Sequence, residues 1–114
     1  MTKFFHSLLF ESAKRYSQHP ALGFKDSLLN YSTLASKTIV AAHELDKLGV
    51  SRADRVAIYL PKTIETVTAI FAVSSAGGVF VPVNPLLKGA QVEYILKDCN
   101  VKVLVTQSIR VKSI

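Results

Sequence analysis

The segment 74–85, Ser-Ser-Ala-Gly-Gly-Val-Phe-Val-Pro-Val-Asn-Pro, limits the possible folds of this chain more than any other. It joins the end of an apolar helix pattern to an unbroken apolar run through the pair Gly77-Gly78. Apolar runs without alternation are typical of strands that are covered on both faces, as in parallel sheets. The segment therefore predicts a helix that turns sharply into a buried strand, which prolines then end.

Helix and strand patterns alternate along the rest of the chain. Apolar residues at helical spacing predict helices over 3–18, 33–48, 63–76 and 89–98. Apolar runs predict strands over 55–60, 79–83 and 101–106, and a hairpin is expected where 21–25 and 28–31 flank Asp26-Ser27. Because short links join the strands and helices in alternation, the sheet should be parallel. We expect an α/β fold with a three-layer, parallel-sheet βαβαβ unit, preceded by a helix, a hairpin and a helix.

Polar residues and glycines mark the ends of these helices. Ser32 and Thr63 stand where N-caps are expected, because a hydroxyl can accept a hydrogen bond from a backbone N–H of the first turn. Gly49 fits the left-handed position after the second helix, with Val50 folding back on that helix. The residues 107–114 show no clear pattern.

Two loops are candidates for binding phosphate. Gly77-Gly78 has the wrong polarity, because a phosphate loop follows a strand and opens a helix, whereas these glycines end a helix and open a strand. A helix stop with positive φ is the favoured interpretation. The loop Leu60-Pro61-Lys62-Thr63 has the right polarity but lacks glycines, so anion binding there is an alternative to simple capping by Thr63.

No catalytic or metal site is predicted. The histidines are far apart in sequence, at His6, His19 and His43, and no group of His, Cys, Asp and Glu has metal-ligand spacing. The acidic residues in polar surroundings are expected to be solvated: Glu44, Asp46, Asp54 and Glu93. Because no nucleophile motif or carboxylate pair appears either, we assign no catalytic, cofactor-binding or metal-binding residue in this chain.

Charge and cysteine content exclude several classes of protein. The net charge is +6, but the basic residues are spread evenly and are not interleaved with aromatic residues, which argues against nucleic-acid binding. The single cysteine, Cys99, lies in an apolar helical pattern and is expected to be a buried thiol. No intrachain disulfide is possible, and no segment is long enough to be transmembrane, so we expect a cytoplasmic protein.

Four sets of segments, in order, resemble motifs of the AMP-forming acyl-CoA ligases in the adenylate-forming superfamily. They are 20–22 with 29–34, 49–50 with 54–61, 76–85, and 93–98 with 103–106. The segment 76–85 is similar to a family motif of alanine and two glycines followed by Val-Pro-x-Asn-Pro. The chain departs from the family pattern at Thr33, at Ser75, at Ala53, where glycine is usual, and at Lys88-Gly89, where threonine and proline commonly start the next helix.

The resemblance implies a two-step reaction for the parent protein. A carboxylic acid, expected to be a fatty acid, attacks ATP to give an acyl-adenylate and pyrophosphate, and the thiol of CoA then displaces AMP. The implied cofactors and partners are ATP, Mg²⁺, CoA and the acid, and Mg²⁺ would stabilise phosphate charge. The family's catalytic motifs have no counterpart here, so the 114-residue piece is expected to be inactive. The residues expected to be structural are Gly77, Gly78, Pro82, Asn84 and Pro85.

The chain is accordingly interpreted as the N-terminal part of an adenylate-forming domain over 1–106, with 107–114 as a tail at a truncation point. A peptide-synthetase adenylation domain or a luciferase-like enzyme is the nearest alternative. A free-standing α/β binding module without catalysis is the alternative from another class. The third helix is too apolar to face water, so the isolated piece is expected to self-associate.

Overall fold

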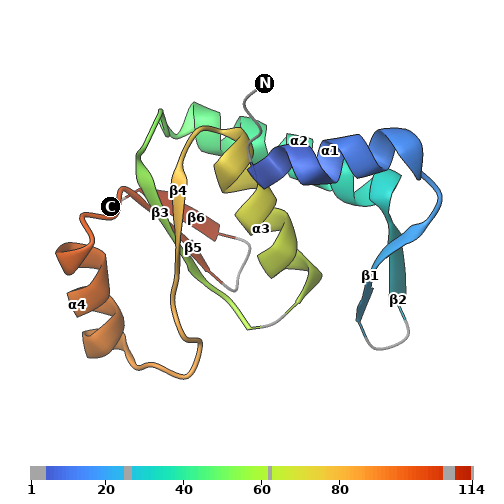
Figure 1. The fold of residues 1–114 in the computed structure, drawn as a ribbon. Helices are drawn as coiled ribbons and strands as arrows, with labels where there is room; N and C mark the ends of the chain where they lie inside the picture. Colours follow the sequence, from blue (N-terminus) through green and yellow to red (C-terminus); the bar gives the residue numbers. More distant parts are fainter. Residues whose placement is uncertain (1–4, 25–26, 62, 107–109, 114) are drawn as a thin grey trace.

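The computed structural model describes residues 5–24, 27–61, 63–106 and 110–113 (Figure 1). The helices are α1 (Phe5–Arg15), α2 (Tyr31–Lys47), α3 (Ile64–Ser75) and α4 (Gly89–Asp98). The strands are β1 (Pro20–Phe24), β2 (Ser27–Asn30), β3 (Arg55–Tyr59), β4 (Val79–Pro82), β5 (Val103–Thr106) and β6 (Arg110–Ser113). The predicted α/β fold is confirmed, with a helix, a hairpin and a helix before a βαβαβ unit.

The larger sheet has the strand order β4-β3-β5-β6 within the described part of the chain. Val56 of β3 stands beside Phe80 of β4 and Val103 of β5, and both pairings are parallel. α3 connects β3 to β4, and α4 then carries the chain to β5 on the other side of β3. The predicted parallel sheet is confirmed, and β6 adds an antiparallel strand beside β5.

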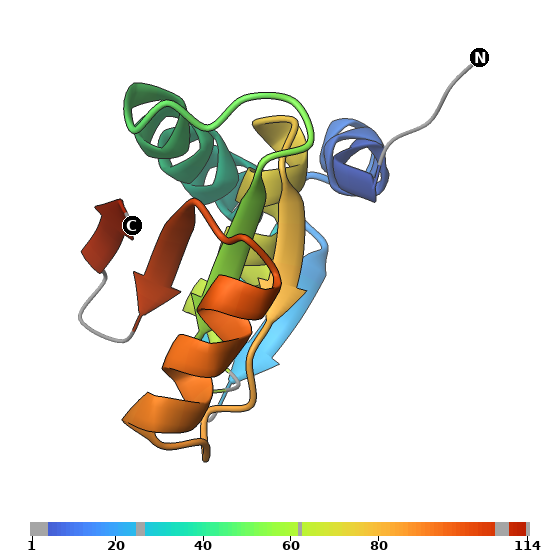
Figure 2. The same cartoon turned by 90° about the vertical axis from the view of Figure 1, so that its left-hand side faces the viewer.

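The two faces of β3 are buried in different layers of the core. Val56 and Ile58 pack with residues of α2 and α3, whereas Ala57 packs with Val92 of α4. These three β3 residues are at most 3% exposed. Because alternate residues of a strand point to opposite faces, the unbroken apolar run reflects a sheet with helices on both sides. Figure 2 shows α4 in front of the strands, with α3 behind them.

The first part of the chain forms a third apolar cluster. Leu9 of α1 and Leu34 of α2 are each 2% exposed, and Phe71 of α3 packs against them. β1 and β2 pair antiparallel in a sheet of their own. Figure 1 shows this hairpin extending from the ends of α1 and α2, away from the larger sheet. The helix–hairpin–helix part is therefore joined to the α/β unit mainly through α3.

α2 begins earlier than the sequence predicts. Its N-cap is Asn30, whose Oδ1 accepts a hydrogen bond of 2.8 Å from the N–H of Thr33. The prediction that Ser32 is the cap was wrong, because β2 runs directly into α2 and asparagine, a strong N-cap residue, stands at the junction. The hairpin is confirmed, but Ser27 belongs to β2, and Lys25 and Asp26 lie outside the described residues.

The strands after α4 also differ from expectation. β5 begins at Val103 rather than at residue 101, because Asn100 takes a positive φ of 52° and Val101 donates its N–H back to Leu96 of α4. The sequence does not predict β6. Its segment Arg-Val-Lys-Ser has a single apolar residue and gives no clear pattern without its partner strand. The division of the chain at residue 106 stays a prediction.

α3 is covered within the chain itself. Every residue of α3 except Glu65 is buried or half-buried, because α1 and α2 pack against it together with β3 and β4. The prediction that α3 would expose apolar side chains to water in the isolated chain was therefore wrong. Self-association itself stays a prediction, which now has to rest on other exposed apolar side chains such as Leu28 and Leu86, at 75% and 83% exposure.

Candidate functional site

Two of the segment sets that carry the resemblance, 49–50 with 54–61 and 76–85, meet at the amino ends of β3 and β4. We call this region the amino-end joint. It comprises Gly49, Val50, Ser51, Ala53, Asp54, Gly77, Gly78 and Lys102. The joint lies where α2 and α3 end, at the opposite end of the strands from the loop that follows β3. Its contacts show what the glycine pair does.

α2 and α3 end in the same backbone arrangement at the joint. Gly49 and Gly77 have positive φ angles of 88° and 87°. The N–H groups of Val50 and Gly78 bond back to carbonyls in the last turns of α2 and α3, at 3.1 and 2.9 Å. This is the Schellman pattern of helix ends. The interpretation of Gly77-Gly78 as a helix stop is confirmed, since the N–H of Gly78 is bonded within the helix end.

Gly78 is required for a different reason, which is the close approach of the backbone. A Cβ atom built on Gly78 would lie 3.0 Å from the carbonyl oxygen of Asp54, 3.1 Å from Val73 Cγ1 and 3.3 Å from Val50 Cγ1. The same carbonyl accepts the N–H of Val79 at 2.7 Å, so it is held in place. The first contact between β3 and β4 therefore needs a residue without a side chain.

Asp54 binds the joint together and is not the solvated residue that the sequence predicts. Its Oδ2 accepts hydrogen bonds from the N–H and Oγ of Ser51, at 2.8 and 3.0 Å, and from Lys102 Nζ, at 3.2 Å. Lys102 Nζ also donates to the carbonyl of Gly49 at 2.7 Å. The hydrogen bond from the Ser51 N–H, followed by that from Lys102, lowers the pKa of Asp54. The sequence does not show this bonding, because Lys102 is 48 residues away from Asp54.

Ala53 has a backbone conformation that usually needs glycine. Its φ is 68°, and its N–H donates to the carbonyl of Gly77 at 2.8 Å. The left-handed conformation costs a residue with a side chain about 1–2 kcal/mol. Since the family pattern has glycine at this position, the joint gives the physical reason for that glycine.

Pro82 and Asn84 shape the exit from β4. Pro82 ends β4, a strand at the edge of the sheet, where proline is tolerated. Asn84 Oδ1 accepts the N–H of Leu86 at 2.9 Å, as in an Asx turn. Tyr59 Oη donates to the carbonyl of Leu87 at 2.6 Å and holds the loop against β3. The described hydrogen bonds of Asn84 and Tyr59 stabilise the loop that follows β4.

A cavity of about 540 Å³ lies at the other end of the sheet, beside the carboxyl ends of β3 and β5. We call it the carboxyl-end cavity. The chain runs from β3 to β4 on one side and then to β5 on the other, so the strand order reverses at β3. Open α/β sheets bind ligands outside the carboxyl ends of their strands at such a reversal. The lining residues are Lys37, Ala41, Leu45, Leu60, Pro61, Thr63, Ile64, Glu65, Thr68, Ala69, Ala72, Val105 and Thr106.

Three threonine hydroxyls in and beside this cavity are bonded within the chain. Thr63 Oγ1 accepts the N–H of Thr66 at 3.4 Å as the N-cap of α3, so the capping interpretation is confirmed. Thr66 Oγ1 donates to the carbonyl of Pro61. Thr68 Oγ1 donates to the carbonyl of Ile64 at 2.9 Å. The remaining lining is mainly aliphatic, so the cavity is an apolar surface more than a polar site.

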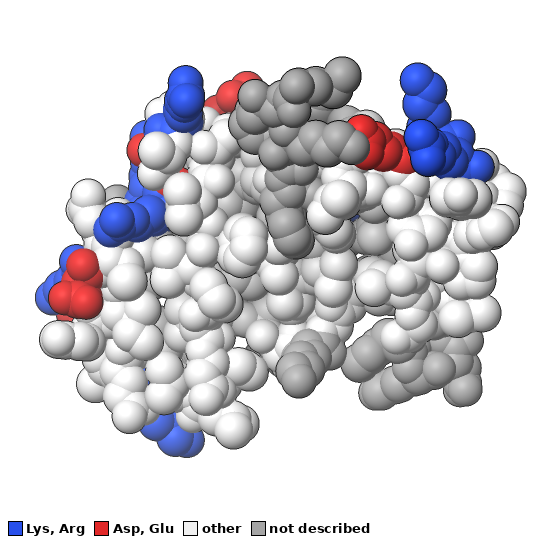
Figure 3. All heavy atoms as spheres, viewed as in Figure 1, with Lys and Arg blue, Asp and Glu red and all other residues white. Residues whose placement is uncertain are grey.

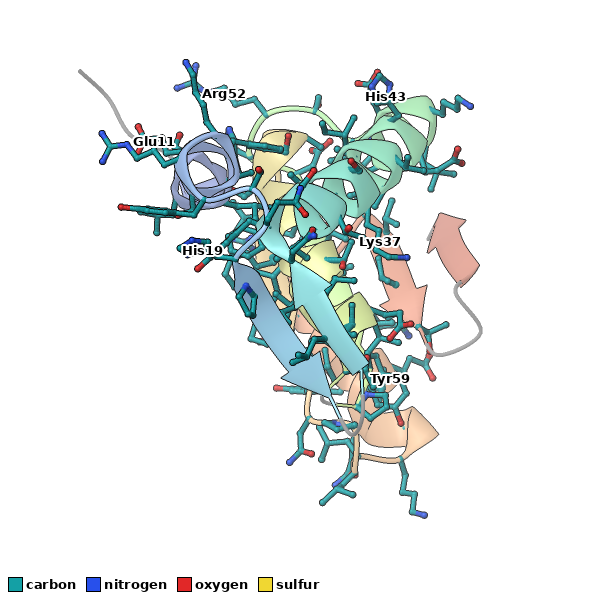
Figure 4. All side chains as sticks on the ribbon, turned by 90° about the vertical axis from the view of Figure 1, so that its right-hand side faces the viewer. Glu11, His19, Lys37, His43, Arg52 and Tyr59 are labelled. Carbon is teal, nitrogen blue, oxygen red and sulfur yellow. The ribbon has the colours of Figure 1, made fainter. Side chains whose placement is uncertain are left out.

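The charges at the rim of the cavity do not make an anion site. Lys37 and Glu65 are both exposed, and they bring one positive and one negative charge. Figure 4 shows Lys37 projecting from α2 on the side of β5. Lys62, the cation of the anion-binding alternative, lies outside the described residues. The described rim therefore gives that alternative no support.

The other titratable residues named from the sequence stay apart. His19 and His43 lie at separate places (Figure 4), and in the described ranges no three His, Cys, Asp or Glu residues are grouped so that they could hold a metal ion. Glu44 and Glu93 form exposed ion pairs with lysines of their own helices, at 3.5 and 3.0 Å. Asp46 is exposed as well. The solvated interpretation is confirmed for these three acidic residues.

One contact that the sequence does not reveal joins α1 to α3. His6 Nδ1 lies 2.9 Å from Ser74 Oγ, and the His6 N–H donates to the same oxygen at 3.2 Å. The ring of His6 packs edge-on against Phe10 at 6.1 Å. Because 68 residues separate the two partners in sequence, no local motif marks them. The pair ties two helices together across the first part of the core.

Cys99 is half-buried rather than buried, which corrects the prediction. It lies just past α4, at the C-cap, and packs at the margin of the apolar cluster that contains Val92. Its carbonyl accepts a hydrogen bond of 2.7 Å from Arg55 Nη1. A cation at a helix C-terminus is favourable, so this contact stabilises the end of α4 against β3.

Basic side chains do not gather into one patch on the face drawn in Figure 3. Lys and Arg stand there in separate groups at the margins, and acidic side chains accompany several of these groups. The expectation that the chain does not bind nucleic acid stays a prediction. Among the described residues, no helix has both the length and the apolarity needed to cross a bilayer.

The sequence and the fold are similar to those of known proteins. The family model for AMP-binding enzymes matches residues 9–114. Surfactin synthase subunit 1 of Bacillus subtilis (strain 168) is 35% identical over 101 residues, which cover 89% of this chain and 3% of that protein. The long-chain-fatty-acid–CoA ligase of the same strain is 34% identical over 104 residues, which cover 91% of this chain and 19% of the ligase.

A solved structure has the same fold. The N-terminal domain of FACL13 from Mycobacterium tuberculosis matches with a TM-score of 0.88 at 25% identity, over 95% of this chain and 28% of that chain. This chain therefore spans less than a third of the length of each of these relatives. Surfactin synthase subunit 1 and the long-chain-fatty-acid–CoA ligase are similar to it to nearly the same degree.

Proposed function

The chain belongs to the AMP-binding enzyme family, and from this premise we propose that it forms part of an acyl-CoA ligase. In the proposed reaction a carboxylate oxygen attacks the α-phosphorus of ATP, which forms acyl-AMP and releases pyrophosphate. The thiol of CoA then attacks the acyl carbon, loses its proton and releases AMP. A fatty acid is the proposed acid, since a long-chain-fatty-acid–CoA ligase is among the relatives.

The observation that carries the proposal is the extent of the family match. It covers residues 9–114, and two of the resembling segment sets, 49–50 with 54–61 and 76–85, fold into one joint with a physical reason for its glycines. A chance resemblance in a few short motifs would not be expected to bring Gly49, Asp54, Gly77 and Gly78 into one joint. The match thus supports membership in a family whose enzymes form adenylates.

The part of the reaction that we propose for this chain is structural. In the described residues, no cluster of His, Cys, Asp and Glu fits a metal ion, so no step is assigned here to Mg²⁺. The amino-end joint sets how β3, β4 and β5 lie together, and the carboxyl ends of these strands then present their loops. We propose that ATP, Mg²⁺, CoA and the acid bind to residues outside this chain.

A peptide-synthetase adenylation domain is the second candidate. The specific observation in its favour is the 35% identity to surfactin synthase subunit 1, against 34% to the CoA ligase. Both candidates make an acyl-adenylate first, so they differ in the acid that is activated and in the acceptor of the acyl group. We also propose that the protein is cytoplasmic and that the isolated 114-residue piece self-associates.

The test is the carboxylate-dependent exchange of labelled pyrophosphate into ATP by the full-length protein. Fatty acids, aromatic acids and amino acids are compared, and product formation with CoA is then measured for the active acids. Exchange with a fatty acid and formation of its CoA thioester support the first proposal. Exchange with an amino acid, without a CoA thioester, supports the second. The absence of exchange with every acid favours a binding module and contradicts both.

A further inference from the structure

We draw no further inference here: the strongest candidate, the apolar carboxyl-end cavity between α2, α3 and the end of β5, carries none, because nothing in the described part of the structure shows what covers its aliphatic lining.

Discussion

Replacement of Gly78 by alanine tests the structural role of the glycine pair. The added Cβ would stand 3.0 Å from the Asp54 carbonyl oxygen and 3.1 Å from Val73 Cγ1. Overpacking of this kind costs about 1–3 kcal/mol. Alanine also restricts the unfolded chain, which offsets about 0.4–1 kcal/mol of that cost. We therefore expect Gly78→Ala to lower the free energy of unfolding by about 1–2 kcal/mol.

Gly89→Ala is the matched control for this change. A Cβ at Gly89, the first residue of α4, would meet nothing within 4 Å, so alanine should stabilise the chain by about 0.4–1 kcal/mol. The measurement is urea unfolding of the 114-residue chain, followed by far-ultraviolet circular dichroism. A Gly78→Ala variant that is as stable as wild type, or that gains as much as Gly89→Ala, would refute the close-approach argument.

The remaining predictions concern three other positions. Ala53→Gly should raise the free energy of unfolding by about 1 kcal/mol, because it relieves the φ of 68°, and urea unfolding measures the change. Thr38→Val should raise it by about 1 kcal/mol, since Thr38 is fully buried and its Oγ1 has no hydrogen-bond partner among the described residues; unchanged or lower stability would contradict this. The pKa of Asp54 is lowered in the folded chain, so its contribution is present above the ordinary value of 3.8 and is lost as the pH falls below it. Urea unfolding at several pH values should thus show a shallower acid loss of stability in Asp54→Asn than in wild type, and identical slopes would contradict the joint.

Local patterns predicted the elements of the α/β unit well. The apolar run through Val56, Ala57 and Ile58 indicated a strand covered on both faces, and Gly77 and Thr63 indicated the ends of α3. These signals depend on the residue and its near neighbours, so one sequence is enough to show them. The same holds for the position of α4, whose bounds at 89–98 match the prediction.

Contacts between distant segments could not be predicted in this way. Asp54 looked solvated because Lys102, its partner, is 48 residues away, and Ser74 showed nothing of its contact with His6. β6 lacks a signal of its own and is defined by pairing with β5. The carboxyl-end cavity was missed for the same reason, since α2, α3 and β5 come together only in the folded chain.

The central claim is that the segment 76–85 builds a structural joint and does not bind nucleotide. Isothermal titration of the 114-residue chain with ATP and Mg²⁺ tests it most directly. We predict no saturable heat up to about 1 mM ATP, for the wild-type chain and for Gly89→Ala alike. Saturable binding by the wild-type chain, weakened in a folded Gly77→Ala or Gly78→Ala variant, would contradict the claim.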